Sequence, residues 1–244
     1  MAVDKKFSHG YTVQLAYTFA KAIDERSANP VDGGDTPQDP NNYRRGQRGL
    51  SNFDQKHILA VNGIWDLPFL KGRGFVSAVF GGWQLSGTTR IGSGFPFSVL
   101  SGRDNALAGT GRSAGAQRPD VVGDAKLDPN RPRNDLVALY FNTAAFIPNG
   151  GPGKEGQYGN SGRNNIVGPG FSQTDLAILK RFGLPRESLG RIEFRTEIFN
   201  LLNQVNFNNP GVGGPSSTLV SPAFGRLLSA RDGRVVQFGL RYDF

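Results

Sequence analysis

The sequence predicts an all-β protein, an antiparallel up-and-down transmembrane β-barrel of which about six strands are present. Three observations support this prediction. Six segments alternate between apolar and polar residues, short and long connections alternate between the segments, and aromatic residues gather at one end of them. The 34 Gly and 15 Pro among 244 residues exclude a compact helical bundle, because both residues break helices.

The first predicted strand, 11–20, alternates most clearly. Every odd position holds a large apolar residue and every even position a small or polar one, as in a strand with two different faces. The apolar residues are Tyr11, Val13, Leu15, Tyr17 and Phe19. The alternation runs for ten residues, which exceeds the usual length of a strand in a soluble protein.

Two further strands are predicted at 56–67 and 75–91. In the first of them, the residues that share one face are Leu59, Val61, Trp65 and Leu67. In the second, the apolar residues Trp83, Leu85 and Ile91 alternate with Gln84, Ser86, Thr88 and Arg90.

The last three predicted strands lie at 172–182, 190–201 and 236–244. In the fourth, the apolar residues are Leu176, Ile178 and Phe182. In the fifth, the polar face carries Glu193, Arg195 and Glu197. In the sixth, the alternating apolar residues are Val236, Phe238, Leu240, Tyr242 and Phe244.

The connections alternate in length. Segments 68–74 and 183–189 are short, whereas 23–55, 92–171 and 203–232 are long. Long structureless loops are uncommon in compact domains, but long loops at one end and short turns at the other are typical of an outer-membrane barrel. With six strands, we expect both ends of the chain on the short-turn side.

Aromatic residues at the short-turn ends agree with a membrane barrel, which carries an aromatic girdle at the headgroup level. They are Tyr11, Trp65, Phe75, Phe182, Tyr242 and Phe244. The alternative interpretation is that these residues form the core of a secreted, soluble β-sandwich that binds carbohydrate or a surface partner, since such a fold has the same alternation.

The net charge of +8 does not predict nucleic-acid binding, because Lys and Arg are scattered along the chain. The densest basic run holds Arg44, Arg45 and Arg48 in a polar stretch typical of a solvated loop. No apolar run reaches the 18 residues of a transmembrane helix. The N-terminus has no apolar segment typical of a signal peptide.

The residues do not predict an enzyme. The chain has no Cys and only two His, which leaves little for metal, cofactor or nucleophilic chemistry. Residues 111–115 match the spacing of a nucleophile elbow, but both His lie upstream. Glu193 and Glu197 could be imagined as a glycosidase pair, but no pocket or defined separation supports it. We therefore expect no catalytic residue, no cofactor and no metal site.

Eight stretches together resemble the C-terminal part of the barrel of TonB-dependent outer-membrane receptors of the Oar-like group. They are FSHG at 7–10, LAYTFAKAID at 15–24, FDQKH at 53–57, GGWQLSG at 81–87, YFNTAAF at 140–146, GNSGRN at 159–164, EIFNLLN at 197–203 and QFGLRYDF at 237–244. The resemblance covers nearly the whole chain.

The resemblance implies a receptor of the outer membrane of a Gram-negative bacterium that takes up an unidentified substrate. The family's barrel has about 22 strands around an N-terminal plug, so residues 1–244 are expected to be a C-terminal fragment that lacks the plug and the N-terminal strands. This chain would supply the last barrel strands and the surface loops. The energy-coupling TonB complex would act through the missing N-terminal parts.

The resemblance also implies roles for individual side chains. Those expected to face the lumen are Gln14, Gln84, Arg90, Glu193, Arg195 and Glu197. Those expected to meet membrane lipid include Val13, Leu15, Tyr17, Leu85, Ile178, Phe194, Phe238 and Leu240. Phe238, Leu240, Tyr242 and Phe244 resemble the C-terminal signal that the outer-membrane assembly machinery recognises. Arg44, Arg45 and Arg48 would contact substrate or lipopolysaccharide phosphates.

Overall fold

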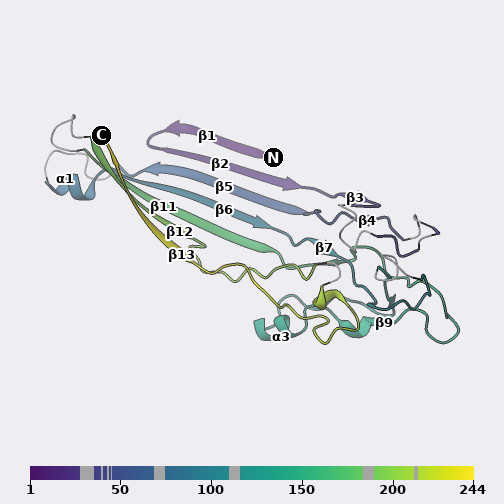
Figure 1. The fold of residues 1–244 in the computed structure, drawn as a ribbon. Coiled ribbons are helices and arrows are strands. Elements are labelled where there is room, and N and C mark those ends of the chain that lie inside the picture. The colour runs from purple at the N-terminus through teal and green to yellow at the C-terminus, as the bar shows by residue number, and fades with distance from the viewer. Residues whose placement is uncertain are drawn as a thin grey trace.

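The computed structural model describes residues 1–27, 36–39, 41–42, 44, 46–68, 75–109, 116–183, 190–211 and 214–244. Within them, seven long strands form one curved antiparallel sheet in the order β1-β2-β5-β6-β11-β12-β13 (Figure 1). Their bounds are β1 Ala2–Ser8, β2 Tyr11–Phe19, β5 His57–Asp66, β6 Trp83–Gly92, β11 Phe171–Gly183, β12 Arg191–Phe199 and β13 Val235–Asp243. Each long strand pairs with the long strands before and after it in the sequence, which confirms the predicted up-and-down topology.

The sheet contains one strand more than the predicted six. Strand β1 was missed because its alternation is broken at Lys5, which falls on the otherwise apolar face. The Lys5 ammonium lies 3.7 Å from the centre of the Tyr11 ring. His9 and Gly10 join β1 to β2, both with positive φ (55° and 84°), as a two-residue turn between twisted strands requires.

The prediction for the chain ends was wrong for the N-terminus. Because seven strands is an odd number, the chain begins on the side of the long connections and ends on the side of the short turns. The C-terminus lies near helix α1 at that end (Figure 1).

The predicted strand 75–91 was also wrong in its first part. Residues Phe75–Phe80 form the helix α1, and the strand begins only at Trp83. Gly81 and Gly82 separate the two elements, and Gly82 has a φ of +67°, a conformation that ends the helix and redirects the chain into β6. No helix among the described residues is long and apolar enough to cross a membrane.

The long connections fold together into a compact unit, which we call the cap: the described residues of 20–56, 93–170 and 200–234. It contains the short strands β3 Ile23–Asp24, β4 Gly49–Leu50, β7 Pro96–Phe97, β8 Asp120–Val121, β9 Phe146–Ile147 and β10 Ile166–Val167, the helix α3 Arg133–Ala138, and the 3₁₀ turns η2 Thr143–Ala145 and η4 Pro215–Ser217. The cap lies beyond the long-connection end of the sheet (Figure 1).

The hydrophobic core lies in the cap and not in the sheet. Every buried hydrophobic side chain in the described ranges belongs to the cap. Phe141 is central, with its ring 6.0, 5.7 and 5.2 Å from those of Phe97, Phe146 and Phe224. A soluble sandwich would have two sheets packed on such a core, whereas the long strands described here form a single sheet.

Candidate functional site

The strand register brings the six residues predicted to line a lumen onto one face of the sheet, which we call the polar face. They are Gln14 of β2, Gln84 and Arg90 of β6, and Glu193, Arg195 and Glu197 of β12. Because side chains alternate along every strand, the shared face follows from the pairing alone.

Hydrogen bonds and ion pairs join side chains of the polar face both between neighbouring strands and within a strand. Gln84 Nε2 donates to Asp66 Oδ1 over 2.6 Å, and Arg181 Nε donates to Glu193 Oε2 over 2.8 Å. The guanidinium of Arg195 lies 2.6 Å from Glu197 Oε1. Both glutamates are thus engaged by arginine. They lie four residues apart on one extended strand and share its polar face.

The opposite face is largely apolar along the seven strands, although Lys5 of β1 lies on it. All eight residues predicted to meet lipid share it: Val13, Leu15, Tyr17, Leu85, Ile178, Phe194, Phe238 and Leu240. Lys180 is the exception in β11. Its ammonium is buried, donates to the carbonyl oxygen of Gly81, and lies 5.7 and 5.2 Å from the ring centres of Trp83 and Phe182.

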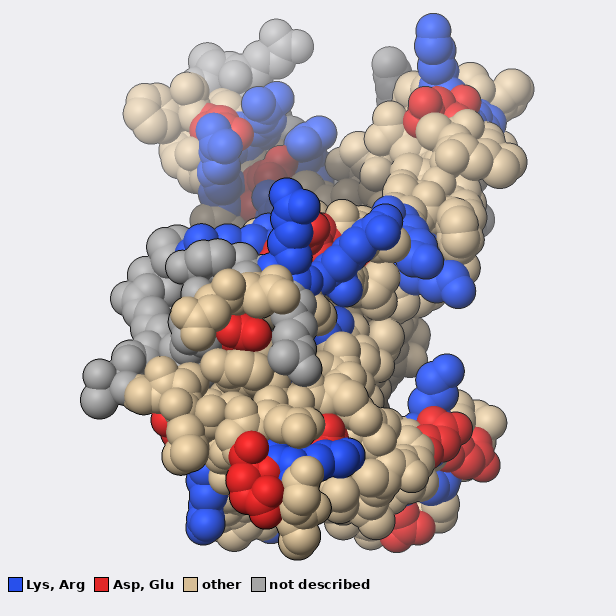
Figure 2. Space-filling model, turned by 90° about the vertical axis from the view of Figure 1, so that its right-hand side faces the viewer, with Lys and Arg blue, Asp and Glu red and all other residues tan. Residues whose placement is uncertain are grey.

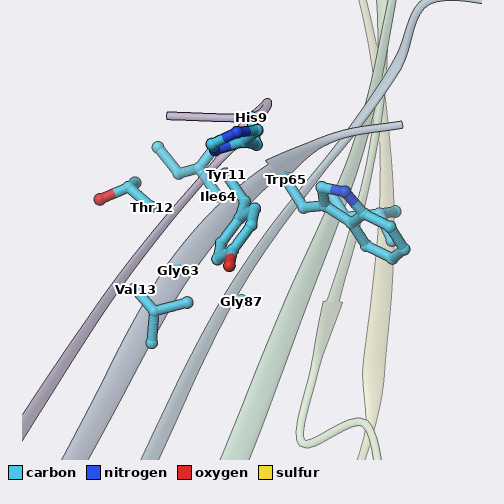
Figure 3. A pocket seen from close by; sticks show the side chains of 9 residues that line it. His9, Tyr11, Thr12, Val13, Gly63, Ile64, Trp65 and Gly87 are labelled. Carbon is cyan, nitrogen blue, oxygen red and sulfur yellow. The ribbon is translucent and has the colours of Figure 1, made fainter. Parts of the chain in front are cut away.

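A hollow of about 510 Å³ lies near the short-turn end of the sheet. It opens where Gly63 of β5 stands opposite Gly87 of β6, since neither residue has a side chain to fill the apolar face there. Figure 3 shows Tyr11 and Trp65 nearer the turn than these glycines, with His9 at the turn itself. The lining is largely apolar, with His9, Tyr11 and Thr12 as its polar side chains.

The predicted girdle aromatics lie at the short-turn ends of their strands. Tyr11 stands opposite Trp65, and Tyr242 stands opposite Ile192, which in turn stands opposite Phe182. Phe75 begins α1, and its side chain lies outside the described part of the chain.

The C-terminal residues Phe238, Leu240, Tyr242 and Phe244 are all highly exposed. The first three share the apolar face of β13, and Phe244 follows the strand directly. Strand β13 pairs with β12 on one side only, so its other edge presents unpaired backbone groups in the described chain.

Two buried arginines, Arg118 and Arg163, join distant segments of the cap. We call these two residues and their hydrogen-bond partners the polar lock. Arg163 binds the carboxylate of Asp24 and donates to the Gln47 carbonyl oxygen over 2.8 Å. Arg118 donates to Gln47 Oε1 over 2.8 Å and to the Ser161 carbonyl oxygen over 2.8 Å. Arg118 and Arg163 are buried, and their partners come from distant parts of the chain.

The lock shifts two pKa values. Burial, together with the nearby charge of Arg163, lowers the pKa of Arg118 to about 10, so that Arg118 stays protonated at neutral pH. Burial acts to raise the pKa of Asp24, but hydrogen bonds from Ser51 and Ser27 and the contact with Arg163 outweigh it, so that the pKa is lowered. The Asp24 carboxylate is therefore ionised at neutral pH.

The predicted basic run only partly falls within the described chain. Arg44 and Arg48 are exposed on the cap, whereas Arg45 and residues 111–115, the sequence match to a nucleophile elbow, lie outside the described residues. Viewed from the cap end, Lys and Arg gather around the hollow between the edges of the curved sheet (Figure 2). Among the described residues, no three His, Cys, Asp or Glu side chains gather where they could hold a metal ion.

Sequence reasoning missed a cluster at the cap end of the polar face. Phe171 begins β11 there, and the guanidinium groups of Arg90 and Arg231 both lie over its ring. Arg231 belongs to a long connection without a strand pattern, so the alternation that indicated Arg90 could not indicate it.

Comparison with known proteins agrees with this arrangement. Residues 1–237 match a family described as "Outer membrane beta barrel domain". No curated protein and no solved structure matches the chain. A sheet with one apolar and one polar face and with long connections at one end is the architecture expected of that family. The chain is an outer-membrane β-barrel domain and belongs to the bacterial outer membrane.

Proposed function

We propose that the chain is the C-terminal part of the barrel of a TonB-dependent receptor of the Oar-like group, which takes up an unidentified substrate. The observation that carries the proposal is the separation of the two faces. Across seven strands one face is largely apolar and the other carries charged and amide side chains, as a barrel between lipid and a wet lumen requires.

The edges of the sheet support a larger barrel. The free edges of β1 and β13 would leave backbone groups unpaired in lipid, and each such group costs several kcal/mol. Further strands of the complete receptor would pair with both edges, and a plug would lie against Gln14, Gln84, Arg90, Glu193, Arg195 and Glu197. The cap would face the outside of the cell, where Arg44 and Arg48 are available to lipopolysaccharide or substrate phosphates.

The proposed orientation can be tested by labelling, because the chain contains no native Cys. In the complete gene product, a Cys at the exposed cap residue Arg103 should react with a membrane-impermeant maleimide in intact cells. A Cys at His9, which is exposed in the turn between β1 and β2, should react only after the outer membrane is permeabilised. Equal labelling of both positions in intact cells would contradict the orientation.

Energy coupling needs a separate test. The complete gene product should bind the periplasmic domain of the host's TonB protein, and deletion of its N-terminal coupling segment should abolish binding. A complete product that has no such segment, or that never binds TonB, would contradict the receptor proposal while leaving the barrel intact.

We also propose that Phe238, Leu240, Tyr242 and Phe244 form the signal read by the outer-membrane assembly machinery. Phe244→Ala should reduce the folded, heat-modifiable fraction in the outer membrane. Gln237→Ala, on the opposite face of the same strand, is the matched control and should leave that fraction unchanged. An equal loss in both variants would indicate a general defect of the strand.

A further inference from the structure

We propose that the cap end of the polar face binds an oxyanion, a phosphate or a carboxylate, between Arg90 and Arg231. The inference rests on the proposed function in one respect: the oxyanion would belong to the substrate that the receptor takes up. The site itself is defined by the geometry of the described residues.

Phe171 is the platform of the site. The Cζ atoms of Arg90 and Arg231 lie 5.5 and 4.8 Å from the centre of its ring. Gly92, directly opposite Phe171 in the register, leaves room for this ring, because a Cβ there would lie 2.6 Å from the ring carbon Cε1. Both cations therefore gain a cation–π contact with the same ring, and both line one cavity.

Asn206 places Arg231 beside this platform. Its buried side chain accepts from the backbone nitrogen of Ser172 and donates to the Ser172 carbonyl oxygen, both over 2.9 Å. The Asn206 carbonyl oxygen accepts from the backbone nitrogen of Arg231 over 2.7 Å. A residue of a long connection is thus fixed to the strand that carries Phe171.

Both guanidinium groups are available to a ligand. Within the described residues neither forms a salt bridge, whereas Arg181 and Arg195 of the same face are paired with Glu193 and Glu197. A cation–π contact uses none of the N–H groups of a guanidinium as hydrogen-bond donors to oxygen, and these groups suit the paired oxygens of a phosphate or carboxylate. Both side chains are exposed to solvent, so that a ligand can reach them.

A cavity of about 240 Å³ adjoins the two arginines and is bordered by one acidic residue, Asp175. Its Oδ1 accepts from the backbone nitrogen of Asn200 over 2.8 Å, and both oxygens accept from Gln173 Nε2 over 3.1 Å. Asp175 therefore orders the wall of the cavity, while its charge opposes an anion. Removing the negative charge of Asp175 should therefore strengthen the binding of an anion.

The test is a calorimetric titration of the complete gene product, purified in detergent, with inorganic phosphate and with acetate as the carboxylate probe. We expect saturable, salt-sensitive binding that Arg90→Gln and Arg231→Gln each weaken by about tenfold or more, because each removes a charged donor. Arg195→Gln, which removes an arginine already paired with Glu197, is the matched control and should bind like the wild type. Asp175→Asn should bind more tightly.

Positioning is tested separately with Asn206→Ala, which leaves both arginines in the chain. It should weaken phosphate binding, and Arg231 should become more reactive toward an arginine-selective reagent. In the wild type, phosphate should protect Arg90 and Arg231 from that reagent but not Arg195. The protection experiment needs no substitution, so it decides the question even where a variant fails to fold.

Absence of saturable binding, or equal weakening by Arg195→Gln, would overturn the site. These outcomes are independent of energy coupling. Phosphate bound at Arg90 and Arg231 by a product that never binds TonB would leave the site standing and remove the receptor proposal. TonB binding without oxyanion binding would leave the receptor proposal standing and remove the oxyanion site.

Discussion

The sheet and the cap of this protein are stabilised in opposite ways. The sheet is held by regular backbone pairing, and both of its faces are largely open in the described chain, with Lys180 as its one buried charge. The cap has little regular structure but holds the buried aromatic cluster around Phe141 and the buried lock of Arg118 and Arg163. The stability of the sheet therefore depends on its surroundings, whereas the cap is stabilised by its own buried core.

The difference shows in the groups that join distant segments. In the sheet these are backbone groups, as where Trp83 of β6 pairs with Lys180 of β11. In the cap, Arg163 reaches Asp24 across 139 positions and Arg118 reaches Gln47 across 71. These contacts join the connections 20–56 and 93–170, and Phe224 of the third connection packs on Phe141, so that the cap is expected to fold and open as one unit.

The largest effect is expected from Arg163→Ala. It removes one partner of a buried ion pair and leaves Asp24 and the Gln47 carbonyl without their donor, which costs about 3–5 kcal/mol. Hydrogen exchange should show loss of protection in the cap, at the amides of Ser51 and Asn164, with the β6–β11 ladder unchanged. Arg103→Ala, at an exposed position of the same cap, is the control. Equal loss of protection in the sheet would contradict the independence of the cap.

The second largest effect is expected from a charge placed on the apolar face of the sheet. Leu15→Arg places a charge in the middle of β2 on the apolar face, and near the midplane of the bilayer it should cost about 2–4 kcal/mol. Gln14→Arg, one residue away on the polar face and opposite Asp4, should cost much less. The measurement is the unfolding free energy of the intact receptor in bilayers. Equal costs at the two positions would argue against lipid contact of the apolar face.

A smaller effect is expected from acidification. The pKa of Asp24 is lowered in the folded cap, so its ionised form stabilises the cap at and above the ordinary value of 3.8. This contribution is lost as the pH falls through the folded pKa. Opening of the cap, followed by hydrogen exchange, should therefore increase below about pH 4. In Asp24→Asn this acid step should be absent, and its persistence would assign the step to another group.

The smallest effect is expected on the polar face. Glu193→Gln breaks the ion pair with Arg181, whose side chain is 56% exposed. Water screens such a pair, so the unfolding free energy should fall by only about 0.2–1 kcal/mol. A loss above about 2 kcal/mol would mean that this part of the face is shielded from water in the complete barrel.

The sheet could be predicted well because each strand is specified by neighbouring residues. The alternation at 11–20, 56–67, 172–182, 190–201 and 236–244 corresponds to β2, β5, β11, β12 and β13. The two failures have local causes. Lys5 interrupted the pattern of β1, and the two glycines at 81–82 ended a short helix where a longer strand had been expected.

The side-chain contacts at the cap end of the sheet and inside the cap could not be predicted from the alternation. Phe171 is the first residue of an alternating strand, but nothing in the sequence indicates that Gly92 makes room for its ring. Arg231 is one of many scattered arginines, and hydrogen bonds such as those of Asn206 fix it beside Phe171 at the start of β11. Likewise, Arg118 and Arg163 look like ordinary loop arginines, although both are buried.

The sequence by itself determined the two faces and their polarity along the strands that it predicted, because the period of two is a property of neighbouring residues along the backbone. Only the tertiary structure decided which arginines are exposed beside an aromatic ring and which are locked inside the cap. The physical reason is that burial and pairing of a charge depend on what distant segments bring to it. The apolar face could therefore be predicted from the sequence. The proposed oxyanion site depends on the tertiary structure, which brings β6, β11 and the connection that holds Arg231 together.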